Sequence, residues 1–64
     1  MSAGIIIGNE TISADGGISI ERAMVSAGKH PDAFLFFVGG RPVPMTTILT
    51  EGMTVTTLRV ASGG

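Results

Sequence analysis

At 64 residues the chain has room for one small domain, which buries only about 60% of the surface that the unfolded chain exposes. Its formal net charge is −1 and its four basic residues are spread along the chain, which argues against the basic patch of a nucleic-acid-binding protein. The absence of cysteine excludes disulfides, thiol nucleophiles and thiolate metal ligands. Hydrophobic residues make up 44% of the chain, which favours a compact core over disorder.

Two short strands are expected at the beginning of the chain. Residues 3–7 (AGIII) are apolar and β-branched, and GNE after them signals a turn. Residues 10–14 (ETISA) alternate well enough to form the returning strand of a hairpin, which DGG at 15–17 ends. The apolar run GIIIG is far shorter than the about 20 residues of a membrane span, and the N-terminus lacks the basic start of a signal peptide. We therefore expect a cytoplasmic protein with no membrane contact.

Residues 18–31 (ISIERAMVSAGKHP) predict the single helix. Ser19 suits the N-cap, and Glu21 places a carboxylate near the positive end of the helix. Gly28 suits the left-handed position after the helix, and Pro31 prevents continuation. One apolar stripe recurs at helical spacing, formed by Ile20, Ala23, Met24 and Ala27.

The C-terminal half predicts further strands. Residues 33–38 (AFLFFV) form the most apolar segment and predict a central strand. Residues 39–44 (GGRPVP) predict a turn and loop, because the two prolines deny backbone donors to a ladder. Residues 46–49 (TTIL) predict a short strand or a turn, and EG at 51–52 predicts another turn. Residues 53–60 (MTVTTLRV) predict the last strand.

This order predicts an α+β roll, in which one helix lies across a mixed sheet and the first and last strands are parallel central neighbours. We expect residues 1–60 to form the single domain and residues 61–64 to form a flexible tail. Most of the core is expected from Ile5, Ile6, Ile7, Ile12, Ile18, Ile20, Met24, Phe34, Phe36, Val38, Val43, Ile48, Leu49, Val55, Leu58 and Val60.

The last two residues of the sequence, Gly63 and Gly64, are candidates for acyl transfer through a C-terminal carboxylate. A carboxylate must be activated, commonly as an acyl-adenylate made from ATP, before it can transfer its acyl group. Glycine has no Cβ, so a diglycine tail can extend into the narrow channel of a partner, and Ala61 and Ser62 are small as well. The alternative is a frayed terminus without a function.

The element order, the turn GGRPVP after an apolar strand, TEG before the last strand and LRVASGG at the end resemble the ubiquitin-like β-grasp proteins. The resemblance covers essentially the whole chain. It is closest to the small archaeal modifier proteins, and next to the sulfur-carrier proteins of molybdopterin and thiamine biosynthesis. It implies a β-grasp roll with the order β-β-α-β-β.

The resemblance also implies a mechanism. A ubiquitin-activating-type enzyme adenylates the Gly64 carboxylate with ATP, and Gly63 gives access to the reacting carbonyl. The acyl group then forms an amide with a target lysine, or a thiocarboxylate that donates sulfur to an accepting enzyme in molybdopterin, thiamine or tRNA thiolation. The chain would be a carrier with no cofactor of its own and not an enzyme. The other class left open is a non-covalent interaction module with an incidental tail.

Alternation along 33–38 predicts a docking patch. We expect Phe36 and Val38 to face the helix, and Leu35 and Phe37 to face outward beside Leu58. An exposed apolar patch on a small protein usually marks an interface, and such relatives dock through this surface. A slip of one residue would invert every assignment. A different alternative is that a homodimer buries both faces.

The apolar residues of the last predicted strand do not alternate cleanly with polar ones, which is consistent with a bulge. Val55 and Leu58 are both apolar, yet regular alternation would place them on opposite faces of the sheet.

The remaining polar residues carry weaker expectations. Arg41, Arg59 and Ser62 are candidates to contact a partner, although solvated surface charge is the simpler interpretation of the arginines. Lys29 is the only lysine and so the only side-chain acceptor for self-conjugation, while a charge at the helix C-terminus is the preferred interpretation. His30 has no second ligand nearby, so no metal site is expected.

Overall fold

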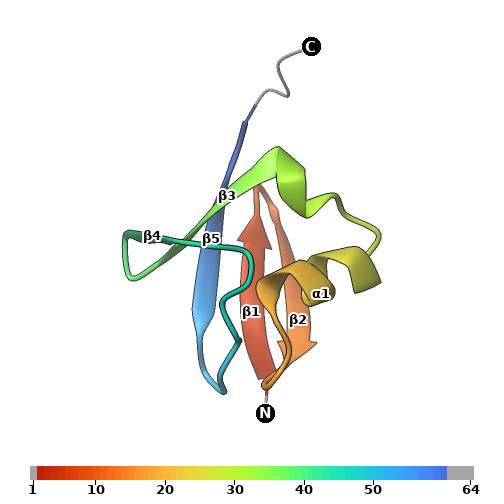
Figure 1. Ribbon diagram of the computed structural model, residues 1–64, viewed down its shortest axis with the longest axis vertical. Coiled ribbons are helices and arrows are strands. Elements are labelled where there is room, and N and C mark those ends of the chain that lie inside the picture. Colours follow the sequence, from red (N-terminus) through yellow and green to blue (C-terminus); the bar gives the residue numbers. More distant parts are fainter. Residues whose placement is uncertain (1, 61–64) are drawn as a thin grey trace.

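The computed structural model describes residues 2–60, which form one mixed sheet with one α-helix on its inner side (Figure 1). The strands are ordered β2-β1-β5-β3-β4. The α+β class is confirmed and is compatible with a β-grasp roll, but the described part of the chain has one strand more than the expected order. In sequence the elements are β1 (Ser2–Ile7), β2 (Glu10–Asp15), α1 (Ile20–Ser26), the 3₁₀ turn η1 (Pro31–Ala33), β3 (Phe34–Val38), β4 (Arg41–Val43) and β5 (Thr54–Arg59).

The predicted hairpin is confirmed. β1 and β2 are antiparallel, and Ile7 lies opposite Glu10 across the two-residue turn Gly8–Asn9. Gly8 has φ 57°, whereas no residue other than glycine has a positive φ between residues 2 and 60. A positive φ at only the first central residue is typical of a type II′ turn, whose twist matches that of the flanking strands.

β1 and β5 are parallel neighbours near the middle of the sheet, as the sequence predicts. Ile5 lies opposite Val55, and the Gly4 amide donates to the Met53 carbonyl at 2.9 Å. Such a pair requires a long crossover connection, and this one contains α1. Because the two strands run in the same direction, β5 ends at the opposite end of the sheet from the start of β1 (Figure 1).

The helix is shorter than the predicted segment 18–31, but its two ends use the predicted residues. The Ser19 hydroxyl accepts the Arg22 amide at 3.1 Å, so Ser19 is the N-cap. Gly28 has φ 78°, and the amide of Lys29 donates to the carbonyl of Met24 at 2.9 Å. This hydrogen bond belongs to a Schellman motif, which ends the helical conformation before Pro31 is reached.

The expectation of a turn and loop over residues 39–44 is wrong in part, because Arg41–Val43 forms β4. Pro42 lies opposite Phe37 and Val43 lies opposite Phe36. A proline is tolerated there because β4 is the edge strand of the sheet and can leave its missing donor on the open side.

The segment between β4 and β5 contains no named strand, and its one bridge joins Ile48 to Ser19. It is attached to the start of the helical region by backbone hydrogen bonds. The Ile20 amide donates to the Thr47 carbonyl at 2.9 Å, and the Leu49 amide donates to the Ile18 carbonyl at 2.8 Å. Leu49 is thereby directed into the core.

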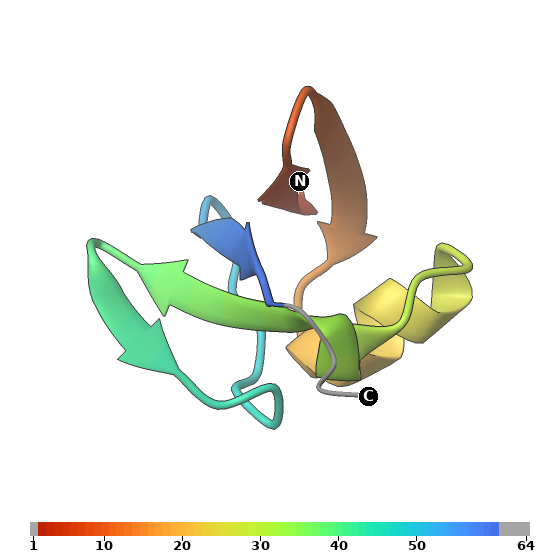
Figure 2. The same ribbon diagram turned by 90° about the horizontal axis from the view of Figure 1, so that it is seen from above.

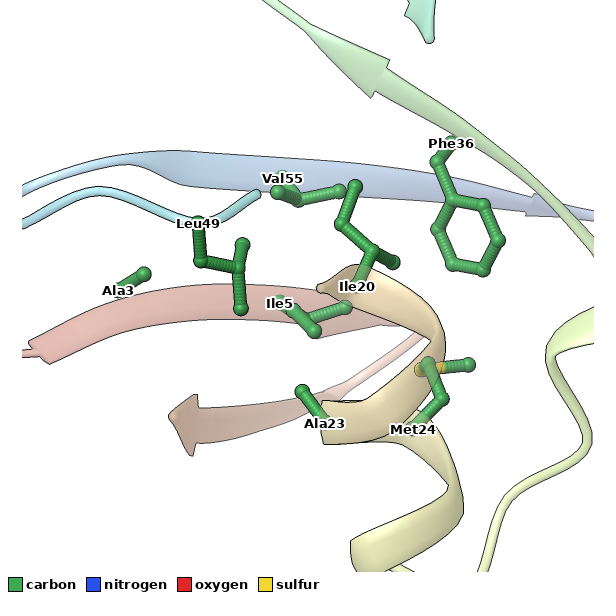
Figure 3. Packing of buried hydrophobic residues seen from close by; sticks show 8 residues of the cluster. All are labelled: Ala3, Ile5, Ile20, Ala23, Met24, Phe36, Leu49 and Val55. Atoms are coloured by element: carbon green, nitrogen blue, oxygen red, sulfur yellow. The ribbon is translucent and has the colours of Figure 1, made fainter. Parts of the chain in front are cut away.

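Figure 3 shows that the buried side chains of the helix, this segment and three strands meet in one cluster. The predicted stripe is confirmed except for Ala27, which is exposed. Two residues predicted for the core are also exposed, since Ile48 retains 52% and Leu58 retains 56% of its accessible surface. The buried cluster consists of Ala3, Ile5, Ile20, Ala23, Met24, Phe36, Leu49 and Val55.

Candidate functional site

The face of the sheet turned away from α1, here called the outer face, carries almost no charge. No described element covers it, as the view from above shows (Figure 2). Strand alternation from the buried residues identifies its members, among which Asp15 alone is charged. They are Ser2, Gly4, Ile6, Thr11, Ser13, Asp15, Leu35, Phe37, Pro42, Thr54, Thr56 and Leu58.

Leu35 and Leu58 lie directly opposite each other on β3 and β5 and are the large hydrophobic residues of this face that are exposed in the described part of the chain. They retain 48% and 56% of their accessible surface. Phe37 lies on the same face, opposite Thr56, but it is half-buried. The orientation predicted for β3 is therefore correct, since Phe36 faces the core and Val38 packs against it.

The bulge considered for the last strand is absent from β5. Its pairing with β3 runs without interruption from Phe34 opposite Arg59 to Val38 opposite Val55. Val55 and Leu58 differ in parity because Val55 faces the core and Leu58 faces outward. Thr57 lies on the same, inner face of β5 as Val55, and its hydroxyl donates to the Ile6 carbonyl at 2.7 Å.

The exit of the chain from the sheet is fixed up to Val60. The Val60 amide donates to the Ala33 carbonyl at 2.9 Å, which attaches the end of the last strand to η1. Arg59 precedes it and lies opposite Phe34. The predicted acyl-transfer residues Gly63 and Gly64, together with Ser62, lie outside the described residues.

A hollow of about 590 Å³ lies beside this exit, between the β1–β2 turn, the residues after α1 and the end of β5. Phe34 contributes to its apolar lining, and Lys29, His30 and Arg59 contribute basic groups. The Lys29 ammonium lies 3.1 Å from a carboxylate oxygen of Glu10. Sequence reasoning missed this pairing, because the two residues are 19 positions apart and only the fold brings them together.

The structure separates the two candidate arginines. Arg59 lies opposite Phe34 at the start of β3, whereas Arg41 lies opposite Val38 at its end. The two therefore do not form one basic surface. Within residues 2–60, His30 belongs to no group of three side chains suited to a metal ion.

No helix within residues 2–60 has the length and apolar character needed to cross a membrane. No protein-family model matches the chain, and a comparison with curated proteins gave no match.

Proposed function

We propose that this chain is a ubiquitin-like modifier that is conjugated to target lysines through the carboxylate of Gly64. The observation that carries the proposal is the position of Leu58 and Leu35 on the strands beside the chain's exit at Val60. An activating enzyme that binds this uncovered apolar pair would hold the tail close to its own active site. In the sequence, the four residues ASGG follow Val60. At about 3.3–3.6 Å per residue, these residues span at most about 14 Å.

The chemistry requires a free α-carboxylate on Gly64. One of its oxygens attacks the α-phosphorus of ATP and pyrophosphate leaves, which gives the acyl-adenylate. The amine of a target lysine then attacks the Gly64 carbonyl, AMP leaves, and the amine loses a proton as the amide forms. The adenylation site belongs to a ubiquitin-activating-type enzyme, and the chain supplies the acyl group and the docking surface. Absence of a Cβ at Gly63 and Gly64 keeps the approach to the carbonyl open.

The same docking surface and tail support a second candidate, a sulfur carrier. A hydrosulfide-class donor would displace AMP from the same adenylate and leave a thiocarboxylate for a sulfur-accepting enzyme. The two candidates share every step up to the nucleophile. A third candidate, a non-covalent interaction module, would use the outer face and would not need the tail.

The products of activation test the proposal. The protein is purified from its source and its intact mass is measured, which establishes whether the chain ends at Gly64. It is then incubated with ATP, a ubiquitin-activating-type enzyme and a cell extract from that source, beside a chain that lacks Gly63 and Gly64. We expect adducts whose tryptic peptides carry the tail on a lysine, and none with the truncated chain. A product with one oxygen replaced by sulfur would favour the carrier. Identical behaviour of both chains would reject both covalent functions and leave the interaction module.

A substitution on the outer face tests the docking step separately. Leu58→Ser should reduce adduct formation by about tenfold or more, since a central apolar contact of an interface contributes about 2 kcal/mol. Its effect on the unfolding free energy should stay below about 1 kcal/mol because the side chain is exposed. Val25→Ser is the matched control, an exposed aliphatic residue on the helix side. Equal adduct formation by Leu58→Ser and wild type would show that docking uses another surface.

A further inference from the structure

The short helix α1 leaves part of the inner face of the sheet uncovered. It has seven residues, a length of about 10 Å, and its buried side chains are Ile20, Ala23 and Met24. In Figure 1, α1 lies level with the middle of β1, and η1 lies near the end of the sheet from which β5 leaves. The inner face between these two elements is therefore covered only in part.

Burial along three strands shows where the cover ends. On each of β1, β5 and β3, one inner side chain is buried and the next inner side chain toward this end is only half-buried. These pairs are Ile5 and Ile7, Val55 and Thr57, and Phe36 and Phe34. The three half-buried residues line the hollow of about 590 Å³ beside the exit of the chain. Small-molecule sites in proteins have volumes of about 300–1,000 Å³, so this hollow is large enough for one.

Charged groups lie at the edge of the same hollow. Glu10 on β2 and Arg59 on β5 share the inner face with its floor, and Lys29 and His30 come from the segment after α1. The Lys29 ammonium is paired with Glu10 at 3.1 Å. Arg59 is exposed, and its guanidinium forms no ion pair or hydrogen bond with any residue between 2 and 60. An apolar floor thus lies beside a guanidinium that no described group neutralises.

We propose that this hollow binds a small organic carboxylate that carries an apolar ring. The guanidinium of Arg59 holds the carboxylate, because its planar set of N–H donors matches the two carboxylate oxygens. The ring lies against Ile7 and Phe34 and is removed from water there. This inference depends neither on the tail nor on the Leu35–Leu58 pair, so it stands or falls separately from the proposed function.

The balance of charge favours a carboxylate over a phosphate ester. Lys29 and Arg59 each contribute one positive charge to the hollow, and Glu10 contributes one negative charge. A carboxylate brings a single negative charge, which equals the net charge of these three side chains. A phosphate monoester brings about −1.5 to −2 at pH 7, and Glu10 would repel the excess.

The probe is 3-phenylpropanoate, which is titrated into the full ¹⁵N-labelled chain while the amide signals are followed by NMR. A ligand of this size should bind with a Kd of about 1 mM. Gly8 and Gly28 line the hollow, so their amide signals should shift as the site fills. Gly40, in the turn between β3 and β4, is not part of the hollow and should keep its position.

Two relatives of the probe separate its charge from its ring. 3-Phenylpropanamide keeps the ring and loses the charge, whereas propanoate keeps the charge and loses the ring. Each should bind about tenfold more weakly than 3-phenylpropanoate. Phenyl phosphate carries the ring and the higher charge, and it should also bind more weakly than the carboxylate.

Substitutions with opposite expected effects test the charged groups. Arg59→Gln should weaken binding by about tenfold, whereas the matched control Arg41→Gln, opposite Val38 at the other end of β3, should bind normally. Glu10→Gln removes the opposing carboxylate and should strengthen binding by about two- to fivefold. All three side chains are exposed, so the variants should fold as the wild type does.

Two kinds of result would overturn the proposal. The first is the absence of shifts at Gly8 and Gly28 at probe concentrations far above 1 mM, or equal binding by the carboxylate and its amide, or by Arg59→Gln and wild type. The second is evidence for another occupant. Tighter binding of phenyl phosphate would assign the hollow to phosphate esters, and the same shifts in the protein alone as its concentration rises would assign it to a second copy. Binding only by a chain that lacks Gly63 and Gly64 would assign it to the chain's own tail.

Discussion

The inner and outer faces of the sheet draw on the same strands and have opposite exposure. On β3, Phe36 retains 3% of its accessible surface, while its neighbour Leu35 retains 48%. On β5, Val55 is fully buried and Leu58 is largely exposed. The helix and the segment around Leu49 cover one face, and no described element covers the other. The free energy of unfolding that a substitution costs should therefore depend on which face the side chain occupies, and not on the residue type.

The size of the molecule makes this contrast steep. Net stability of about 0.05–0.15 kcal/mol per residue gives a chain of 64 residues only about 3–10 kcal/mol. Full burial of one isoleucine or leucine contributes about 1.5–3 kcal/mol. The burial of one side chain on the inner face thus contributes a large share of the free energy of unfolding. A side chain on the outer face can bind a partner while contributing little to that free energy.

The largest effect is expected from Met24→Asp, which places a carboxylate in the core. Met24 is fully buried, and no described charged side chain is buried near it to compensate. The cost should exceed about 4 kcal/mol, which unfolds the chain and exposes FLFFV, an apolar segment of high β-propensity. Val25→Asp, one residue further and exposed, should cost less than about 1 kcal/mol. Circular dichroism and light scattering distinguish the two, and a soluble, cooperatively folding Met24→Asp would contradict the packing.

The second largest loss of stability, about 2–5 kcal/mol of unfolding free energy, is expected from Leu49→Ala. The substitution leaves a cavity beneath the segment between β4 and β5, which contains no named strand. Ile48→Ala is the matched control. Its side chain is more than half exposed, so its loss should cost below about 1 kcal/mol. Urea unfolding of both variants gives the comparison. Equal midpoints would mean that the segment is not part of the core.

Thr57→Val should cost about 1 kcal/mol, because it removes the hydroxyl that donates to the Ile6 carbonyl and keeps the shape of the side chain. Thr56→Val changes the adjacent residue, which is exposed on the outer face and donates to the Phe37 carbonyl only at 3.5 Å, so this change should be neutral within about 0.5 kcal/mol. Thermal unfolding should rank Thr57→Val below wild type and Thr56→Val. The reverse order would assign the hydroxyl no role in joining β5 to β1.

The smallest effect is expected from Glu10→Gln, which breaks the ion pair with Lys29. The two side chains retain 58% and 32% of their accessible surface, so water and salt screen the attraction. The loss should stay below about 1 kcal/mol and should shrink further as salt is added. A double substitution with Lys29→Gln measures the coupling between the two charges. A coupling that persists in high salt would mean that the pair is more strongly desolvated than its exposure indicates.

Much of the fold could be predicted from local patterns. Ser19 and Gly28 mark the helix ends because each satisfies backbone groups within a few residues of itself. The alternation in β3 gave the correct orientation of Leu35 and Phe36, since a strand surrounded by strands has one covered side and one open side. The hairpin follows from a glycine at the first position of a two-residue turn.

Other features of the candidate site had no local signal. Pro42 predicts a loop by itself, and only its place at the edge of the sheet allows β4 to form there. Val55 and Leu58 indicate a bulge when read alone, because a sequence does not say that one of two apolar residues is left uncovered. The pairing of Lys29 with Glu10 joins two elements across the fold.

The sequence by itself determined the β1–β2 hairpin and the helix with its caps, because each depends on residues close together along the chain. Only the tertiary structure decided that Arg41–Val43 pairs as an edge strand and that Lys29 meets Glu10. Those features depend on which strands become neighbours and on where the single helix lies. Their physical reason is the burial of the inner face, which one helix and one segment can cover while the outer face stays open.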